Sequence, residues 1–315
     1  MKIVHISNTP CAGAPYVISR LMGKYMDCES RLVQNRNRLS DGKAYPKDLL
    51  LSDPESSSVI RDSDVVFVHN KLADRRQTNI LDGKRVVLIC HSQPHHVDQE
   101  LMGRADAVAV VAQYQPRLYL DLGWKISLVP NLIDIYDPVF SVKDRNKALT
   151  IGFTPSNTNE WPNEDLFKWN RKGYRETMKI LKESGVGFYF DTGKPIEDIL
   201  KNRARCHIVI DELVTGSYHR TSLEAAASGQ VALNGMDDEC IRTFKWITET
   251  DDTPFFIIRL NELLGVIDQA KRVAAWAGIE GAFAEKWMKK HWVPSDLVNR
   301  FYKPLATGDG IKVFK

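Results

Sequence analysis

Residues 208–234 are the part of the chain that best indicates its fold. They read Ile208-Val-Ile-Asp-Glu-Leu-Val-Thr-Gly-Ser-Tyr-His-Arg-Thr-Ser-Leu-Glu-Ala-Ala-Ala-Ser-Gly-Gln-Val-Ala-Leu-Asn234. The apolar, β-branched runs at the two ends predict buried strands, and a polar turn between them leads into a helical run that stops at a glycine. A strand, a helix and a second strand in this order predict a βαβ unit with parallel strands.

The start of the predicted helix carries groups that suit a phosphorylated ligand. Backbone N–H groups at a helix start bind anions, and Gly216 lets a ligand approach the main chain closely. Glu224 lies in the first turns of the helix, where its carboxylate can reach a ribose or sugar hydroxyl. This pattern is typical of a sugar-nucleotide site, and the alternative is an ordinary βαβ connection with an incidental glutamate. The small polar residues of the turn and helix start are Thr215, Ser217, Thr221 and Ser222.

Eight residues of this stretch resemble the donor-binding signature of the retaining GT-B glycosyltransferases of the family 4 type. They are Asp211, Gly216, Tyr218, Leu223, Glu224, Ala225, Ala227 and Gly229. The resemblance implies that Glu224 binds the ribose of a nucleotide-sugar donor. The donor-binding residues that it implies in this stretch are Gly216, Tyr218, His219, Arg220, Thr221, Ser222 and Glu224.

One acidic residue of the family signature is missing. Many members carry another glutamate eight positions before the second one, and that position is Gly216 here. Two explanations stay open. In retaining transfer along a same-side path, the departing phosphate accepts the proton of the acceptor and no other base is needed. Alternatively, Asp211 or Glu212 takes the place of the missing acid. We favour the first.

A second motif strengthens the resemblance. Residues 150–157 end a predicted strand in a small polar turn, and Arg171-Lys172-Gly173 opens the next helix after an insertion. This resembles the Pro-Ser … Lys-Gly pattern of the same family and implies that Ser156, Arg171 and Lys172 hold the donor diphosphate. Cations and helix N–H groups would stabilise the charge that develops on the leaving phosphate. A surface pair is the alternative, but a helix start disfavours cations.

The N-terminal half contributes a turn and a histidine. Gly13 follows the first predicted strand and resembles the family's glycine-rich turn beneath the transferred sugar; without GxGxxG, NAD binding is disfavoured. His91 ends another predicted strand, where the family commonly has a histidine facing the sugar; a histidine that only hydrogen-bonds at a strand end is the alternative. His69, at the neighbouring strand end, is a weaker candidate. Asp62 and Asp64 are predicted to cap a strand rather than to bind a metal.

Alternating apolar and helical segments predict a doubly wound α/β fold. The alternation breaks at residues 135–148, a predicted linker. We expect two Rossmann-like domains, at residues 1–140 and 146–289, facing each other across a cleft. The resemblance adds the GT-B arrangement, with a C-terminal helix at about residues 290–315 crossing back to the N-terminal domain. Predicted strands of the first half are 2–6, 31–34, 65–69, 85–90, 107–111 and 126–129; the tail is predicted to be helical at 260–276 and 282–305.

Composition fits a globular protein without membrane spans. The chain has 315 residues, 43% of them hydrophobic and 26% charged, which is enough for two domains. It enters a strand at once and has five scattered cysteines, so we expect no signal peptide, reduced thiols and a cytoplasmic location, in a host cytoplasm if the gene belongs to a phage. A net charge of +3 is too small to imply nucleic acid.

The resemblance implies a metal-independent, retaining glycosyltransferase with His91, Glu224 and Lys172 as its catalytic residues. Its only cofactor-like requirement is the nucleotide-sugar co-substrate, a UDP- or GDP-sugar, and its acceptor is an envelope glycan, a lipid-linked sugar or a small molecule. One alternative is a phage-type enzyme that glycosylates hydroxymethylated bases in DNA. Arg36 and Arg38, predicted on the acceptor side, would then contact the phosphate backbone together with residues 71–76. A second alternative is a non-catalytic sugar-nucleotide-binding protein.

Overall fold

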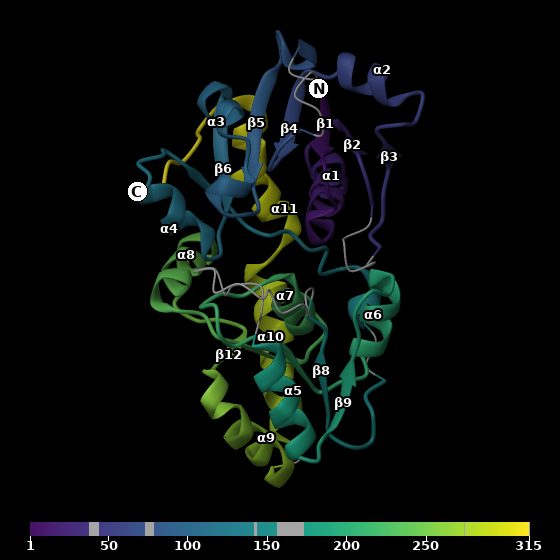
Figure 1. Cartoon of the computed structure of the whole chain (residues 1–315), viewed down its shortest axis with the longest axis vertical. Helices are drawn as coiled ribbons and strands as arrows, with labels where there is room; N and C mark the ends of the chain where they lie inside the picture. The colour runs from purple at the N-terminus through teal and green to yellow at the C-terminus, as the bar shows by residue number, and fades with distance from the viewer. Residues whose placement is uncertain (38–43, 73–78, 142–143, 156–172, 274, 315) are drawn as a thin grey trace. The chain divides into compact units, whose positions relative to one another are not determined.

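The computed structural model describes all residues except 38–43, 73–78, 142–143, 156–172, 274 and 315 (Figure 1). The described residues form two compact units. The first comprises residues 1–37, 44–134 and 294–314, and the second comprises residues 135–293, each with the gaps just given. Arg38, Ser156, Arg171 and Lys172, predicted as site residues, lie outside the described residues.

The first unit is built on a seven-stranded parallel sheet in the order β3-β2-β1-β4-β5-β6-β7. Most of its strand residues are buried, as a parallel sheet covered on both faces requires. The order reverses at β1, which pairs with both β2 and β4, so the topological switch point lies there. The strands are β1 Lys2–Ser7, β2 Glu29–Gln34, β3 Leu49–Leu50, β4 Val65–His69, β5 Arg85–Cys90, β6 Ala107–Val111 and β7 Ser127–Val129.

The C-terminal segment belongs to this first unit. Tyr302 donates a hydrogen bond to the carbonyl of Pro130 (2.7 Å), and Arg85 donates one to the carbonyl of Leu305 (2.7 Å). The helical segment predicted over 282–305 is divided in the structure: one helix ends at His291 and the next begins at Pro294, a residue that suits the first turn of a helix. The helices of the unit are α1 Ala14–Tyr25, α2 Ser56–Arg61, α3 Gln99–Arg104, α4 Gln115–Leu120, α11 Pro294–Leu297 and α12 Lys303–Thr307, with a π-helical turn at Val298–Tyr302.

The second unit has a five-stranded parallel sheet in the order β12-β11-β10-β8-β9. Its switch point lies at β8, which pairs with β10 and β9. The strands are β8 Thr150–Phe153, β9 Gly187–Phe190, β10 Ile208–Glu212, β11 Val231–Asn234 and β12 Phe255–Ile257, and the helices are α5 Tyr174–Glu183, α6 Ile196–Arg203, α7 Arg220–Ala227, α8 Asp238–Thr248, α9 Leu263–Arg272 and α10 Trp276–His291. Within the described part of the chain, every helix is too short or too polar to cross a lipid bilayer.

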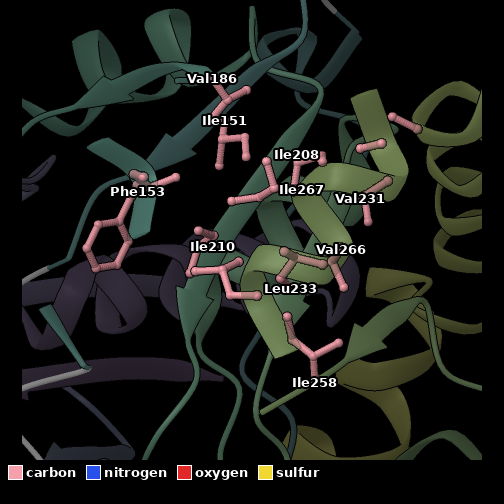
Figure 2. Packing of buried hydrophobic residues seen from close by; sticks show 14 of the residues in the cluster. Ile151, Phe153, Val186, Ile208, Ile210, Val231, Leu233, Ile258, Val266 and Ile267 are labelled. Atoms are coloured by element: carbon pink, nitrogen blue, oxygen red, sulfur yellow. The ribbon is translucent and has the colours of Figure 1, made fainter. Parts of the chain in front are cut away.

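Buried aliphatic side chains hold the second sheet in place (Figure 2). Ile208 and Ile210 pack with Ile267 of α9 in one cluster, and Val209, between them, is also fully buried. Because alternate residues of a strand point to opposite faces, β10 is covered on both faces. Each of these side chains stabilises the unit by about 1.5–3 kcal/mol. The end of β10, where the polar loop begins, is therefore firmly anchored.

Candidate functional site

The loop that follows β10 is organised by Glu212. One carboxylate oxygen of Glu212 accepts hydrogen bonds from the amides of Val214 (3.1 Å) and Thr215 (2.6 Å), and the other accepts one from the amide of Ser217 (2.8 Å). Glu212 is fully buried. Both of its oxygens are bound to the main chain of the loop, so this acid fixes the shape of residues 213–217.

Asp211 binds the start of α7. Its Oδ2 accepts hydrogen bonds from the amide of His219 (2.5 Å) and from the hydroxyl of Ser222 (2.8 Å), and its Oδ1 lies 3.3 Å from Nδ1 of His219. A carboxylate at a helix N-terminus also interacts favourably with the helix dipole. Ser222 is fully buried and its hydroxyl also accepts a hydrogen bond from Asn234 (3.1 Å). Asp211 thus holds the backbone of His219 and the side chain of Ser222 at the start of α7.

Gly216 is held in a conformation that other residues rarely adopt. Its φ is +77°, and a β-carbon at this position would lie 2.9 Å from Cγ of Asp237. Asp237 donates its amide hydrogen to the carbonyl of Gly216 (3.0 Å) and caps α8 through a hydrogen bond from the amide of Cys240 (2.9 Å). The carboxylate of Asp237 therefore lies where a side chain of residue 216 would begin.

Asp237 is a residue of this loop region that no sequence motif marks as a site residue. An aspartate between a strand and a helix is the expected pattern of a helix cap, and that signal was present in Asp237-Asp238-Glu239. What the pattern does not contain is the proximity of this half-buried carboxylate to Gly216.

Glu224 lies in a buried group of charges. Arg203 of α6 donates a hydrogen bond to one oxygen of Glu224, and Nη2 of Arg220 lies 3.3 Å from the other. The side chains of Arg203 and Glu224 are only 3% and 4% exposed. Arg203 also lies 3.5 Å from the hydroxyl of Thr154, at the end of β8. The role of Glu224 as a ribose ligand stays a prediction, and Arg203 is a member of the site that no sequence pattern indicated.

Tyr218 anchors the loop from inside. Its ring is fully buried, edge-on to Phe244 with 5.2 Å between ring centroids, and 5.5 Å from Phe255. A ring without exposed surface cannot stack on a ligand in this structure. Thr221 is half-buried and lies in the first turn of α7, beside the partly exposed Arg220.

Gly173, the described end of the second sequence motif, lies next to the loop that follows β10. Gly173 has a φ of +62°, and a β-carbon there would lie 2.6 Å from a methyl group of Val214. Because Gly173 follows Lys172 directly, the described end of the second motif contacts the loop of the first.

The carboxyl edge of the first sheet carries a strained turn. Cys11, Ala12 and Gly13 have φ values of 42°, 54° and 79°, and Gly13 donates its amide hydrogen to the carbonyl of Pro10 (2.7 Å). Non-glycine residues in this region cost about 1–3 kcal/mol each and tend to occur at functional sites. Burial raises the pKa of the Cys11 thiol, so the thiol is protonated at neutral pH.

Asn70 joins three strand ends at this edge. It follows β4 with a φ of 63°, accepts a hydrogen bond from the amide of His91 (2.7 Å) and donates one to the hydroxyl of Ser92 (3.0 Å). Its amide nitrogen also lies 3.7 Å from the sulfur of Cys11. Asn70 was not predicted as a site residue, because an asparagine at a strand end is the only signal that the sequence gives for it.

His91 does not stand alone. Its Nε2 lies 2.8 Å from Nδ1 of His69, whose Nε2 lies 3.0 Å from Nδ1 of His5. Burial lowers the pKa of His5 to about 3, and burial with the two neighbouring histidines lowers that of His69 well below its ordinary range. Both rings are therefore neutral at physiological pH. The structure brings His91 and Gly13 to the same edge of the sheet, while Arg36 is exposed beyond the end of β2.

The two aspartates before β4, Asp62 and Asp64, contact other residues of the protein. Asp64 accepts a hydrogen bond from the amide of Lys2 (2.7 Å), and Asp62 lies 3.6 Å from Arg61. In the part of the chain that the structure describes, no three His, Cys, Asp or Glu side chains are grouped so as to hold a metal ion.

A scan of protein-family models and a search of curated protein sequences find no match to this chain. Solved structures do resemble it. Sucrose-phosphate synthase from Thermosynechococcus elongatus is 11% identical with a TM-score of 0.59, over 98% of this chain and 100% of that one. A glycosyltransferase from Rickettsia africae is 10% identical with a TM-score of 0.58, over 97% and 98% of the two chains.

WaaG, a glycosyltransferase involved in lipopolysaccharide biosynthesis, is 10% identical with a TM-score of 0.56, over 98% of this chain and 100% of that one. At such low identity the likeness is evidence of fold alone. The two parallel sheets, their helices and these neighbours agree with the expected architecture: the chain has the GT-B fold.

Proposed function

We propose that this protein is a glycosyltransferase that moves a sugar from a nucleotide-sugar donor to an acceptor hydroxyl, with retention and without a metal ion. The observation that carries the proposal is the loop 213–219 with the start of α7. It lies at the carboxyl end of β10, next to the strand where the sheet order reverses, in a chain with the GT-B fold. Ligands of open α/β sheets bind at this place.

The donor pyrophosphate binds against the first turn of α7. The first turn of α7 has backbone N–H groups without a preceding helical turn, and such groups bind anions; the hydroxyl of Thr221 adds a further donor. Lys172, which lies outside the described residues and directly precedes Gly173 in the sequence, supplies the positive charge. Each charge-assisted contact contributes about 1.5–3 kcal/mol to donor binding.

The proton of the acceptor passes to the departing phosphate. Asp211 and Glu212, the two acids that could have replaced the missing one, are both engaged by the main chain of the loop. This supports the same-side path without a separate base. His91 and the turn Cys11–Gly13, at the carboxyl edge of the first sheet, are our candidates for acceptor-side residues. We further propose a cytoplasmic location and, as the acceptor, an envelope glycan, a lipid-linked sugar or a small molecule.

A panel of UDP-, GDP-, ADP- and CMP-sugars tests the proposal by thermal shift, followed by a donor-hydrolysis assay. A donor at 100 times its dissociation constant should stabilise the fold by about 2.7 kcal/mol. Stabilisation by one class of donor, with slow hydrolysis, is the expected result. The proposal fails if none of them raises the melting temperature. Binding without any hydrolysis or transfer would favour the non-catalytic alternative instead.

Replacing Lys172 tests the diphosphate site itself. Lys172→Ala should weaken donor binding about 10- to 100-fold, because one charge-assisted contact is lost. Lys179→Ala is the matched control, since Lys179 is exposed on α5 of the same unit and its ion pair with Glu183 is long, at 3.9 Å. Equal affinities in the two variants would argue against the site. A salt titration with duplex DNA decides the nucleic-acid alternative, which requires binding that weakens steeply with salt.

A further inference from the structure

Three histidines from three neighbouring strands form a hydrogen-bonded chain. His5 lies in β1 and His69 ends β4, while His91 directly follows β5, and these strands are consecutive in the first sheet (Figure 1). The linked nitrogens are 3.0 Å apart between His5 and His69 and 2.8 Å apart between His69 and His91. The inner two rings are almost fully buried, and His91 is half-buried at the carboxyl edge.

With neutral rings, the three linked histidines permit only two arrangements of their ring protons. A neutral imidazole has one N–H donor and one bare nitrogen that accepts. The rings of His5 and His69 are neutral because burial lowers their pKa values. Either each ring donates towards His91, or each ring donates towards His5. Neutral His91 carries its proton on Nδ1 in the first arrangement and on Nε2 in the second.

The environment of His5, the innermost of the three histidines, decides between the two proton arrangements. Nε2 of His5 is buried and has no hydrogen-bond partner among the described residues. The ring of Phe67 stacks on His5 with 4.9 Å between centroids. If the protons pointed towards His5, this nitrogen would carry an N–H with nothing to receive it. Folded proteins leave buried N–H groups unpaired more rarely than acceptors, so His5 keeps Nε2 bare and donates through Nδ1.

We propose that His5 and His69 are positioning residues that hold His91 as the Nδ1–H tautomer. His91 then meets its ligand as a hydrogen-bond donor, and its Nε2 is occupied by the N–H of His69. It does not act as the base that takes the acceptor's proton. This inference rests on the proposed function for the identity of the ligand, a lone-pair oxygen of the transferred sugar, but the tautomer is a property of the protein alone.

The test is ¹⁵N NMR of the histidine-labelled full chain at neutral pH, which shows which ring nitrogen is protonated. We expect Nδ1 of His91 to be protonated and Nε2 to be bare, with the signal assigned from His91→Gln. In His69→Phe the donor to Nε2 is lost, and the Nε2–H form of His91 should appear. His96→Gln, which removes an exposed histidine that is not one of the three linked histidines, should change neither signal. A wild-type His91 protonated on Nε2 overturns the proposal, even if His69→Phe does not fold.

Activity supplies a second readout. The amide nitrogen of asparagine reproduces the position of Nδ1, and that of glutamine reproduces Nε2. If His91 donates through Nδ1, His91→Asn should retain about tenfold more kcat than His91→Gln, with similar donor affinity. The reverse order would contradict the assignment of Nδ1 as the donor. Because the NMR measurement needs no donor, absence of all transferase activity would refute the proposed function and leave the tautomer result intact.

Discussion

At the scale of single residues, two carboxylates of the second unit act on the main chain. Glu212 binds three amides of the loop, and Asp211 binds the amide of His219 and the hydroxyl of Ser222. Both were sequence candidates for the missing acid. Their bonds to neighbouring residues could not be predicted, because a strand end places a side chain at an edge without saying which amides it will meet.

Gly216 offers a direct test of the loop geometry. Gly216→Ala should lower the free energy of unfolding by at least about 1–2 kcal/mol, because alanine is strained at a φ of +77° and its β-carbon meets Asp237. Gly265→Ala in α9 is the control, since nothing lies within 4 Å of a β-carbon there, and it should stabilise the helix by about 0.5–1 kcal/mol. Thermal melts of the two variants compare them. Equal melting temperatures would show that residue 216 does not have this conformation.

His5 makes stability depend on pH. Its pKa is about 3 in the folded chain and near 6.5 when unfolded, so between these values the unfolded state binds more protons. Stability should therefore fall as pH drops from about 6.5 towards 3, by up to about 1.4 kcal/mol per pH unit from this residue. His5→Phe should flatten this dependence in denaturant titrations at several pH values. An unchanged slope would mean that His5 is not buried as a neutral ring.

At the scale of elements, regular periodicity was enough to predict most strands. The predicted strands at 65–69, 85–90 and 107–111 coincide with β4, β5 and β6, because apolar, β-branched runs between polar turns have few other structures open to them. The helical segment predicted at 282–305 is interrupted between His291 and Pro294, because its apolar pattern continues past Pro294 while a proline lacks the amide hydrogen that a continuous helix would need there. Contacts between distant elements carried no signal: neither Arg203 beside Glu224 nor His5 beside His69 follows from local sequence.

The contact between α6 and α7 predicts a coupled pair of residues. Glu224→Ala leaves Arg203 buried without its counter-charge and should destabilise the second unit by about 3–5 kcal/mol. The double variant Glu224→Ala with Arg203→Met removes both charges and should recover much of that loss. Denaturant unfolding of the single and double variants measures the coupling. Additive losses would contradict a direct pair. Loss of activity in Glu224→Ala must accordingly be compared with its folded fraction.

At the scale of the whole molecule, the chain passes from the first unit to the second and then returns. Residues 294–314 join the unit that residue 1 begins, through the hydrogen bonds of Tyr302 and Arg85 and a bridge between Ile126 and Phe314. The break at Pro294 marks the return. The boundaries between the two units, after residues 134 and 293, both fall in connecting residues that belong to no helix or strand.

Tyr302 tests how strongly the returning segment is held. Tyr302→Phe leaves the carbonyl of Pro130 without this donor and should cost about 0.5–1.5 kcal/mol of stability, or more if no water replaces it. Tyr136→Phe is the control, because Tyr136 is 53% exposed. Calorimetry should show the loss in the Tyr302 variant only. A wild-type melting profile for Tyr302→Phe would show that the segment is held by its apolar contacts alone.

The return of the chain also sets an order of assembly during translation. A ribosome finishes residues 135–293 before it makes residues 294–314, yet the latter are part of the unit that contains the N-terminus. Domains usually fold in the order in which they are synthesised, the N-terminal one first. Here residues 135–293 can complete the second unit before the ribosome has made residues 294–314, the last helical segment of the first unit.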